Sequence, residues 1–130
     1  MKQITDRRAV SGHFVIEQVQ AAAQNGLDKV RLLSMSGICP DVLKHPQQRV
    51  SFEQFATLMH TIWHEMQDES CGFLERPLKV GTFAMMCHAT ITCPNLRRAL
   101  LRSERYFNIL TDELRFELQD NKPEATVNIH

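Results

Sequence analysis

The chain has 130 residues, and its 15 basic and 15 acidic side chains leave a formal net charge of zero. A neutral chain creates no overall field that attracts nucleic acid or an anionic membrane, which argues against direct DNA binding by this segment. With 43% hydrophobic residues it can bury one core, and no apolar run reaches the roughly 18 residues that a membrane helix needs.

The first elements in chain order are predicted to be helices. Residues 1–6 lead into no signal-type hydrophobic region, which indicates a cytoplasmic protein. Apolar residues at helical spacing predict a first helix over residues 14–24, which ends at Asn25-Gly26. A short second helix opens at Asp28 and runs to residue 35, and one helical turn is expected after Pro40.

The next helix has the strongest start signal in the chain. Ser51 and Gln54 have the spacing of a capping box, and Val50 with Phe55 fits a hydrophobic staple. Helical spacing then predicts one broad buried face, made of Phe52, Phe55, Ala56, Met59, Ile62, Trp63 and Met66.

A methionine-rich segment over residues 81–91 is apolar on all sides, so we expect a buried helix there. A second, amphipathic helix is expected to follow with Pro94 at its first position. Its predicted buried face consists of Leu96, Ala99, Leu100, Ser103, Tyr106, Phe107 and Leu110.

The hydrophobic period changes from helix to strand at the end of the chain. Leu114, Phe116 and Leu118 alternate with polar residues, residues 120–123 form a turn, and alternation resumes through residue 129, which predicts a terminal hairpin. The fold class expected is therefore α+β, mainly α-helical with a C-terminal β-hairpin. Because an isolated hairpin is marginal in water and its last strand would be an exposed edge, we expect the chain to be a truncated part of a larger domain.

Three stretches of this half resemble a known family. The step Gly81-Thr82-Phe83 into the apolar helix, the junction from Thr92-Cys93-Pro94-Asn95 into Leu96-Arg97-Arg98-Ala99-Leu100, and the stretch Arg105-Tyr106-Phe107-Asn108-Ile109-Leu110 resemble the N-terminal effector domain of AraC-type transcriptional regulators. The branch is the one called arabinose-binding-like, and the resemblance covers roughly residues 14–130. It implies an inducer-sensing role, further strands after the hairpin, and a separate C-terminal domain with two helix-turn-helix units that binds DNA.

Neither catalysis nor a bound metal is expected from the cysteines and histidines. Cys39, Cys71, Cys87 and Cys93 fall in core-like or helix-edge contexts and lack the spacing of a disulfide framework, a zinc site or a redox motif, so we interpret them as free, buried thiols. His60 and His64 have the i, i+4 spacing that would let two imidazoles bind one metal, but they fall on the polar flank of their helix. Cys87 and His88 point about 100° apart on a helix and do not form a nucleophile–base pair. The chain is therefore not expected to be an enzyme, and no cofactor is implied.

Methionines and aromatic residues suggest where an effector would bind. They would line either an adaptable apolar pocket or an ordinary core, and the resemblance favours the pocket. His88 is either a satisfied core histidine or a donor that faces a ligand. The residues predicted to line the pocket are Met59, Trp63, Phe83, Met86, His88 and Tyr106.

The Pro94 helix also carries a second face of arginines with two aliphatic residues. Such a mixture is typical of interfaces, so this face is expected to bind a second copy or the downstream domain, with DNA phosphate as a third option. The residues are Arg98, Leu101, Arg102, Arg105 and Ile109. Residues 1–130 are thus predicted to form a single sensing and dimerisation domain with a small-molecule effector, a homodimer partner, and DNA contact only through the C-terminal domain. The alternatives are a ligand-free interaction module and a metal- or redox-sensing domain that uses the cysteines and histidines.

Overall fold

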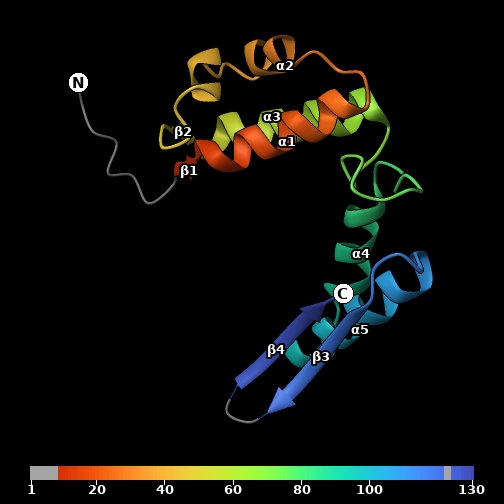
Figure 1. The fold of residues 1–130 in the computed structure, drawn as a ribbon. Coiled ribbons are helices and arrows are strands. Elements are labelled where there is room, and N and C mark those ends of the chain that lie inside the picture. Colours follow the sequence, from red (N-terminus) through yellow and green to blue (C-terminus); the bar gives the residue numbers. More distant parts are fainter. Residues whose placement is uncertain (1–8, 122–123) are drawn as a thin grey trace. The chain divides into compact units, whose positions relative to one another are not determined.

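The computed structural model describes residues 9–121 and 124–130 (Figure 1). The predictions for residues 1–6 and for Lys122-Pro123 of the terminal turn lie outside the described residues. The chain divides into two compact units, Met1–Val80 and Gly81–His130. No helix within the described residues is both long enough and apolar enough to span a membrane.

The first unit is built on the helices α1 (Gly12–Gln24), α2 (Lys29–Met35) and α3 (Phe52–Met66), with a 3-10 turn, η1 (Pro40–Leu43). These elements confirm the predicted helices over residues 14–24 and 28–35 and the turn after Pro40. Each helix contacts the other two, and η1 packs against α1 and α2 (Figure 1). The core between them is almost free of polar groups and consists of Val15, Val19, Ala22, Leu32, Leu33, Ile38, Val42, Val50, Leu58, Ile62 and Cys71.

Two strands of three residues each were not predicted. β1 (Ala9–Ser11) pairs antiparallel with β2 (Arg49–Ser51), and Val10 lies opposite Val50. Each strand ends in a serine that caps the following helix, so the pairing ties the starts of α1 and α3 together. Gly12 permits the start of α1 to approach η1 and the backbone before β2 closely, because a Cβ there would lie 2.7 Å from Val42 Cγ2 and 2.8 Å from the Gln48 carbonyl oxygen.

The start of α3 confirms the capping box. Ser51 Oγ accepts a hydrogen bond from the Gln54 amide at 3.1 Å, and Gln54 Oε1 accepts one from the Ser51 amide at 3.0 Å. The predicted buried face is correct around Ile62, but it includes Phe52 wrongly and omits Leu58. Leu58 is 0% exposed and Phe52 is 59% exposed, since the two side chains lie about 120° apart around the helix.

The second unit contains α4 (Thr82–Thr90), α5 (Leu96–Leu110), β3 (Phe116–Asn121) and β4 (Glu124–Ile129). The terminal hairpin is confirmed: β3 and β4 pair antiparallel, with Leu118 opposite Val127. α4 packs on α5, and α5 packs on β3. Helices and two antiparallel strand pairs together confirm the α+β class.

The prediction of a buried helix over residues 81–91 is wrong. None of the residues of α4 is buried, Phe83 and Met85 are exposed, and Ile91 after its end is 79% exposed. Within the described part of the second unit, α5 is the one element that packs broadly on α4. Because a single neighbouring helix covers only one side of α4, the other sides stay exposed.

The prediction for α5 needs two corrections. The helix begins at Leu96 rather than at Pro94, because the Asn95 side chain caps it by accepting a hydrogen bond from the Arg98 amide at 2.9 Å. Of the predicted buried face, Leu96 and Leu110 are exposed, while Tyr106 and Phe107 are half-buried. The middle of the helix is therefore half-buried, and its ends are exposed.

The four cysteines are free, as predicted. Only Cys71 is buried in the core, whereas Cys39 and Cys87 are exposed and Cys93 is half-buried. The expectation of buried thiols is thus wrong for Cys39, which lies at the start of η1, and for Cys87 on the exposed side of α4.

Candidate functional site

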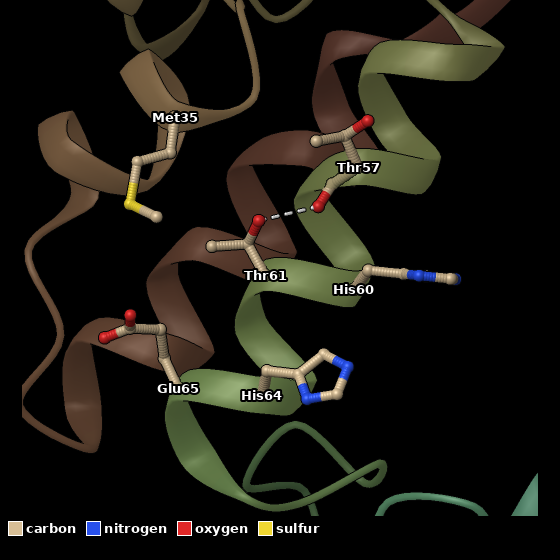
Figure 2. A pocket seen from close by; sticks show the side chains of 6 residues that line it. All are labelled: Met35, Thr57, His60, Thr61, His64 and Glu65. Carbon is tan, nitrogen blue, oxygen red and sulfur yellow. Dashed lines mark hydrogen bonds between the residues drawn. The ribbon is translucent and has the colours of Figure 1, made fainter.

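A hollow of about 370 Å³ lies beside α2 and α3, and we call it the α2–α3 hollow (Figure 2). Met35, the last residue of α2, forms one wall, and α3 supplies the other residues. The lining consists of Met35, Thr57, His60, Thr61, His64 and Glu65. The α3 residues come from successive turns of one helix, because positions three and four apart lie on the same side.

The two threonines offer hydrogen-bond acceptors to a bound molecule. Thr57 Oγ1 donates to the Glu53 carbonyl at 2.9 Å, and Thr61 Oγ1 donates to the Thr57 carbonyl at 2.8 Å. The second of these bonds is drawn in Figure 2. Since both hydroxyl protons are used within the helix, the oxygens keep their lone pairs for a ligand.

The remaining polar groups add a carboxylate and two imidazoles. Glu65, which lines the hollow, forms a solvent-exposed ion pair with Arg31 at 3.4 Å. The His60 ring stacks on Trp63 with 5.4 Å between ring centroids. Both His60 and His64 are exposed, as predicted. Among the described residues, no group of three or more His, Cys, Asp or Glu side chains is placed to hold a metal ion.

A buried carboxylate shapes the loop that follows α3. Asp68 accepts hydrogen bonds from the amides of Ser70 at 2.8 Å, Gly72 at 2.9 Å and Leu78 at 2.8 Å. Burial alone raises the pKa of Asp68, but the bonds from the Ser70 hydroxyl and from these amides outweigh it, and the pKa is lowered from 3.8. Asp68 was missed by sequence reasoning, although an Asp followed by Ser70 and Gly72 is a turn signal.

Cys71 is the buried thiol of the same loop. Its pKa is raised from 9.0, chiefly because burial disfavours the thiolate. A thiol of this kind packs as a small apolar side chain. The geometry therefore gives no support to a reactive cysteine at this position.

The residues of the predicted effector pocket divide between the two units. Met59 and Trp63 are half-buried on α3 and pack against the core of the first unit. In the second unit, Met86 Sδ accepts a hydrogen bond from Ser103 Oγ at 3.2 Å, and the Tyr106 hydroxyl donates to the Thr82 carbonyl at 2.9 Å. Met86 and Tyr106 thus lie where α4 meets α5.

The other two pocket residues, Phe83 and His88, are exposed on α4. For His88, exposure excludes the interpretation as a satisfied core histidine. The pocket formed by all six residues stays a prediction.

The predicted interface face of α5 is only partly open. Arg102 Nη1 donates to the Ala89 carbonyl at 2.8 Å near the end of α4, and Leu101 is half-buried. Arg98 and Arg105 are exposed, and Ile109 is 78% exposed. Ile109 lies one turn after Arg105, and its exposed side chain keeps this end of the face available to a partner.

One comparison with known proteins identifies a relationship. The family model described as the arabinose-binding domain of AraC transcription regulators, N-terminal, matches residues 26–130. No curated protein and no solved structure matches the chain. The matched segment includes α2 and α3 and therefore every residue that lines the α2–α3 hollow.

Proposed function

Because the chain belongs to the family of N-terminal arabinose-binding domains of AraC transcription regulators, we propose that it senses a small-molecule effector and thereby controls DNA binding by a separate C-terminal domain. The match over residues 26–130 is the observation that carries this proposal. The family is a regulatory ligand-binding domain and not a class of enzyme. Residues 1–130 would act as one sensing domain of a cytoplasmic regulator.

The α2–α3 hollow is the effector site that the geometry supports best. Its hydroxyl oxygens and its carboxylate accept hydrogen bonds, its imidazoles either donate or accept, and the Met35 side chain offers an apolar wall. This combination suits a small, hydroxyl-bearing molecule. Such a ligand alters DNA binding only if it binds more tightly to one of two arrangements of the regulator.

We also propose that the chain forms a homodimer through α5. Arg98, Arg105 and Ile109 are exposed on α5, and Ile109 lies one turn after Arg105. Interfaces are enriched in arginine beside large apolar residues. DNA itself would be contacted by the C-terminal domain, in keeping with a net charge of zero.

A ligand-free interaction module is the second candidate function. It is favoured by the number of large apolar side chains that the second unit exposes, among them Phe83, Met85, Leu96 and Ile109. Exposed apolar patches of this kind mark protein interaction sites.

Thermal denaturation against a metabolite library, with and without a chelator, distinguishes these functions. Effector sensing predicts that at least one metabolite raises the midpoint, because a ligand that binds only the folded state adds about 2.7 kcal/mol at 100 times its Kd. An unchanged midpoint with every metabolite would support the ligand-free module. A midpoint lowered by the chelator alone would support metal sensing.

A further inference from the structure

A second hollow, of about 390 Å³, adjoins the α2–α3 hollow at the end of α3, and we call it the Asp68 hollow. Its lining includes the apolar residues Leu27, Met66 and Pro77 and the polar residues Asn25, Glu65 and Asp68. Glu65 also lines the α2–α3 hollow. Because one residue borders both hollows, a single molecule can extend from one into the other past Glu65.

Among the described residues that line the two hollows there are carboxylates but no lysine or arginine. Figure 2 shows the side chains of Glu65 and Thr61 on the side of α3 that faces Met35, whereas the imidazole rings of His60 and His64 point to the other side. The charged group beside the Met35 wall is therefore the Glu65 carboxylate.

Asp68 supplies a second negative charge next to Glu65. Its side chain is buried, with 3% exposed, and the groups that donate to it are neutral: the Ser70 hydroxyl and the amides of Ser70, Gly72 and Leu78. Although burial raises the pKa of Asp68, these bonds outweigh that effect, so the carboxylate is ionised at neutral pH. A buried charge is normally paired with an opposite charge, and neutral donors do not supply one.

Arg31 offsets only part of this negative charge. Its guanidinium group pairs with Glu65 at 3.4 Å, and its side chain is 63% exposed. Since so exposed an ion pair is weak, a cation that binds in the hollows can share the Glu65 carboxylate with Arg31. One guanidinium group beside the carboxylates of Glu65 and Asp68 leaves a net negative charge where the two hollows meet.

The neutral polar groups around Glu65 are acceptors as well. Asn25 Nδ2 donates to the Ala21 carbonyl at 3.0 Å, which leaves Oδ1 for a ligand. The hydroxyl protons of Thr57 and Thr61 are used within α3, so these oxygens also accept. A molecule that fills both hollows therefore has to donate hydrogen bonds and to carry positive charge.

We propose that the effector carries a protonated amine beside its hydroxyl groups, as an amino sugar or an amino alcohol does. This inference rests on the proposed function, because it names the class of effector for the same site. The hydroxyl groups lie in the α2–α3 hollow, and the ammonium group lies against Glu65 at the entrance to the Asp68 hollow. An ammonium group donates three hydrogen bonds and accepts none, which matches the acceptors around it.

Two matched sets of compounds test the proposal by NMR titration, at a pH at which the amines are protonated and at low ionic strength. D-Glucosamine, D-glucose and D-glucuronate share a sugar ring, and D-glucamine, D-sorbitol and D-gluconate share an open chain. In each set we expect the amine to bind at least about tenfold more tightly than the neutral compound, and the acid to bind most weakly. The amine should also shift the amides of Asn25 and of residues 65–68.

Glu65→Gln removes the charge and keeps the size of the side chain, so it should lower the affinity for the amine to that for the neutral compound. Glu53→Gln is the matched control, because Glu53 is exposed on the same helix and does not line either hollow. This variant should keep the full preference. Arg31→Ala should raise the preference about threefold, since it removes the guanidinium group that competes for Glu65.

The outcomes separate this inference from the proposed function. A neutral or acidic compound that binds at α2 and α3 as tightly as the amine overturns the inference and leaves the proposed function standing. So does a Glu65→Gln variant that keeps the full preference for the amine. Absence of binding by both sets also overturns the inference, and the proposed function fails with it if the metabolite library leaves the thermal midpoint unchanged.

Discussion

Leu58 and Phe52 are both large apolar residues of α3, but their surroundings differ completely. Leu58 is fully buried in the core of the first unit, while the Phe52 side chain is largely in solvent. We predict that Leu58→Ala destabilises the protein by about 3 kcal/mol, since it removes buried methyl groups and leaves a cavity. Phe52→Ala should change the stability by less than about 0.5 kcal/mol. Urea denaturation of both variants measures the difference, and equal losses would mean that the assigned phase of α3 is wrong.

Asp68 makes the stability of the first unit depend on pH. Its pKa in the folded protein lies below 3.8, so the folded state favours the carboxylate more than the unfolded state does. The stabilisation is therefore complete above about pH 5 and is lost as the pH falls through the folded-state pKa. We predict that Asp68→Asn costs about 1–3 kcal/mol at pH 7, because one amide oxygen does not satisfy three amide donors.

The same substitution should flatten the acid limb of the stability curve. Thermal denaturation of wild type and Asp68→Asn between pH 2 and pH 7 would show the two midpoints converging at low pH. A constant difference across the whole range would mean that the Asp68 carboxylate does not carry the pH dependence.

At the scale of elements, local signals were predictable and long-range ones were not. The capping box at Ser51 and Gln54 and the stop at Asn25-Gly26 depend on neighbouring residues, and both are found. The β1–β2 pairing joins Val10 to Val50, and three-residue strands carry too few positions for a period to be detected.

The prediction for α4 failed for a different reason. Its all-apolar sequence indicated burial, but burial depends on how many elements surround a helix, and that number is not encoded in the helix itself. The candidate site shows the same limit. The exposure of His60 and His64 followed from helix phase, whereas the position of Met35 beside α3 required the fold.

The Asn108 side chain on α5 forms hydrogen bonds with the backbone carbonyl and amide of Phe116 on β3. Removing this side chain should therefore affect β3 alone. We predict that Asn108→Ala speeds the hydrogen exchange of the Phe116 amide about tenfold or more, since its side-chain acceptor is lost. The Glu117 amide is the internal control because it faces β4 and keeps its strand partner. An unchanged exchange rate of the Phe116 amide would show that Asn108 does not protect the outer edge of β3.

At the scale of the whole molecule, the two units differ in how much they bury. The first unit encloses a core that includes Leu33, Leu58 and Ile62, whereas none of the described residues of the second unit is fully buried. Local stability follows buried apolar contact. We therefore predict that amides in the middle of α1 and α3 exchange more slowly than those of α4 and α5, as measured by native-state hydrogen exchange. Equal protection in both units would mean that the second unit is covered in solution.

The central claim is that this AraC-family domain binds an effector at the α2–α3 hollow. Thr61→Val tests that site because it removes a hydroxyl from the hollow while keeping the size of the side chain. Thr90→Val is its matched control, because Thr90 also donates to a helix carbonyl, that of Met86 at 3.0 Å, but lies in the second unit.

The most direct measurement is an NMR titration of the wild-type chain and both variants with the metabolites that raise the thermal midpoint, and with L-arabinose. We predict saturable binding with shifts concentrated at residues 35 and 57–65, an affinity about tenfold weaker in Thr61→Val, and no change in Thr90→Val. Saturable binding that leaves the amides of α2 and α3 unshifted, or no binding by any of these compounds, would contradict the account.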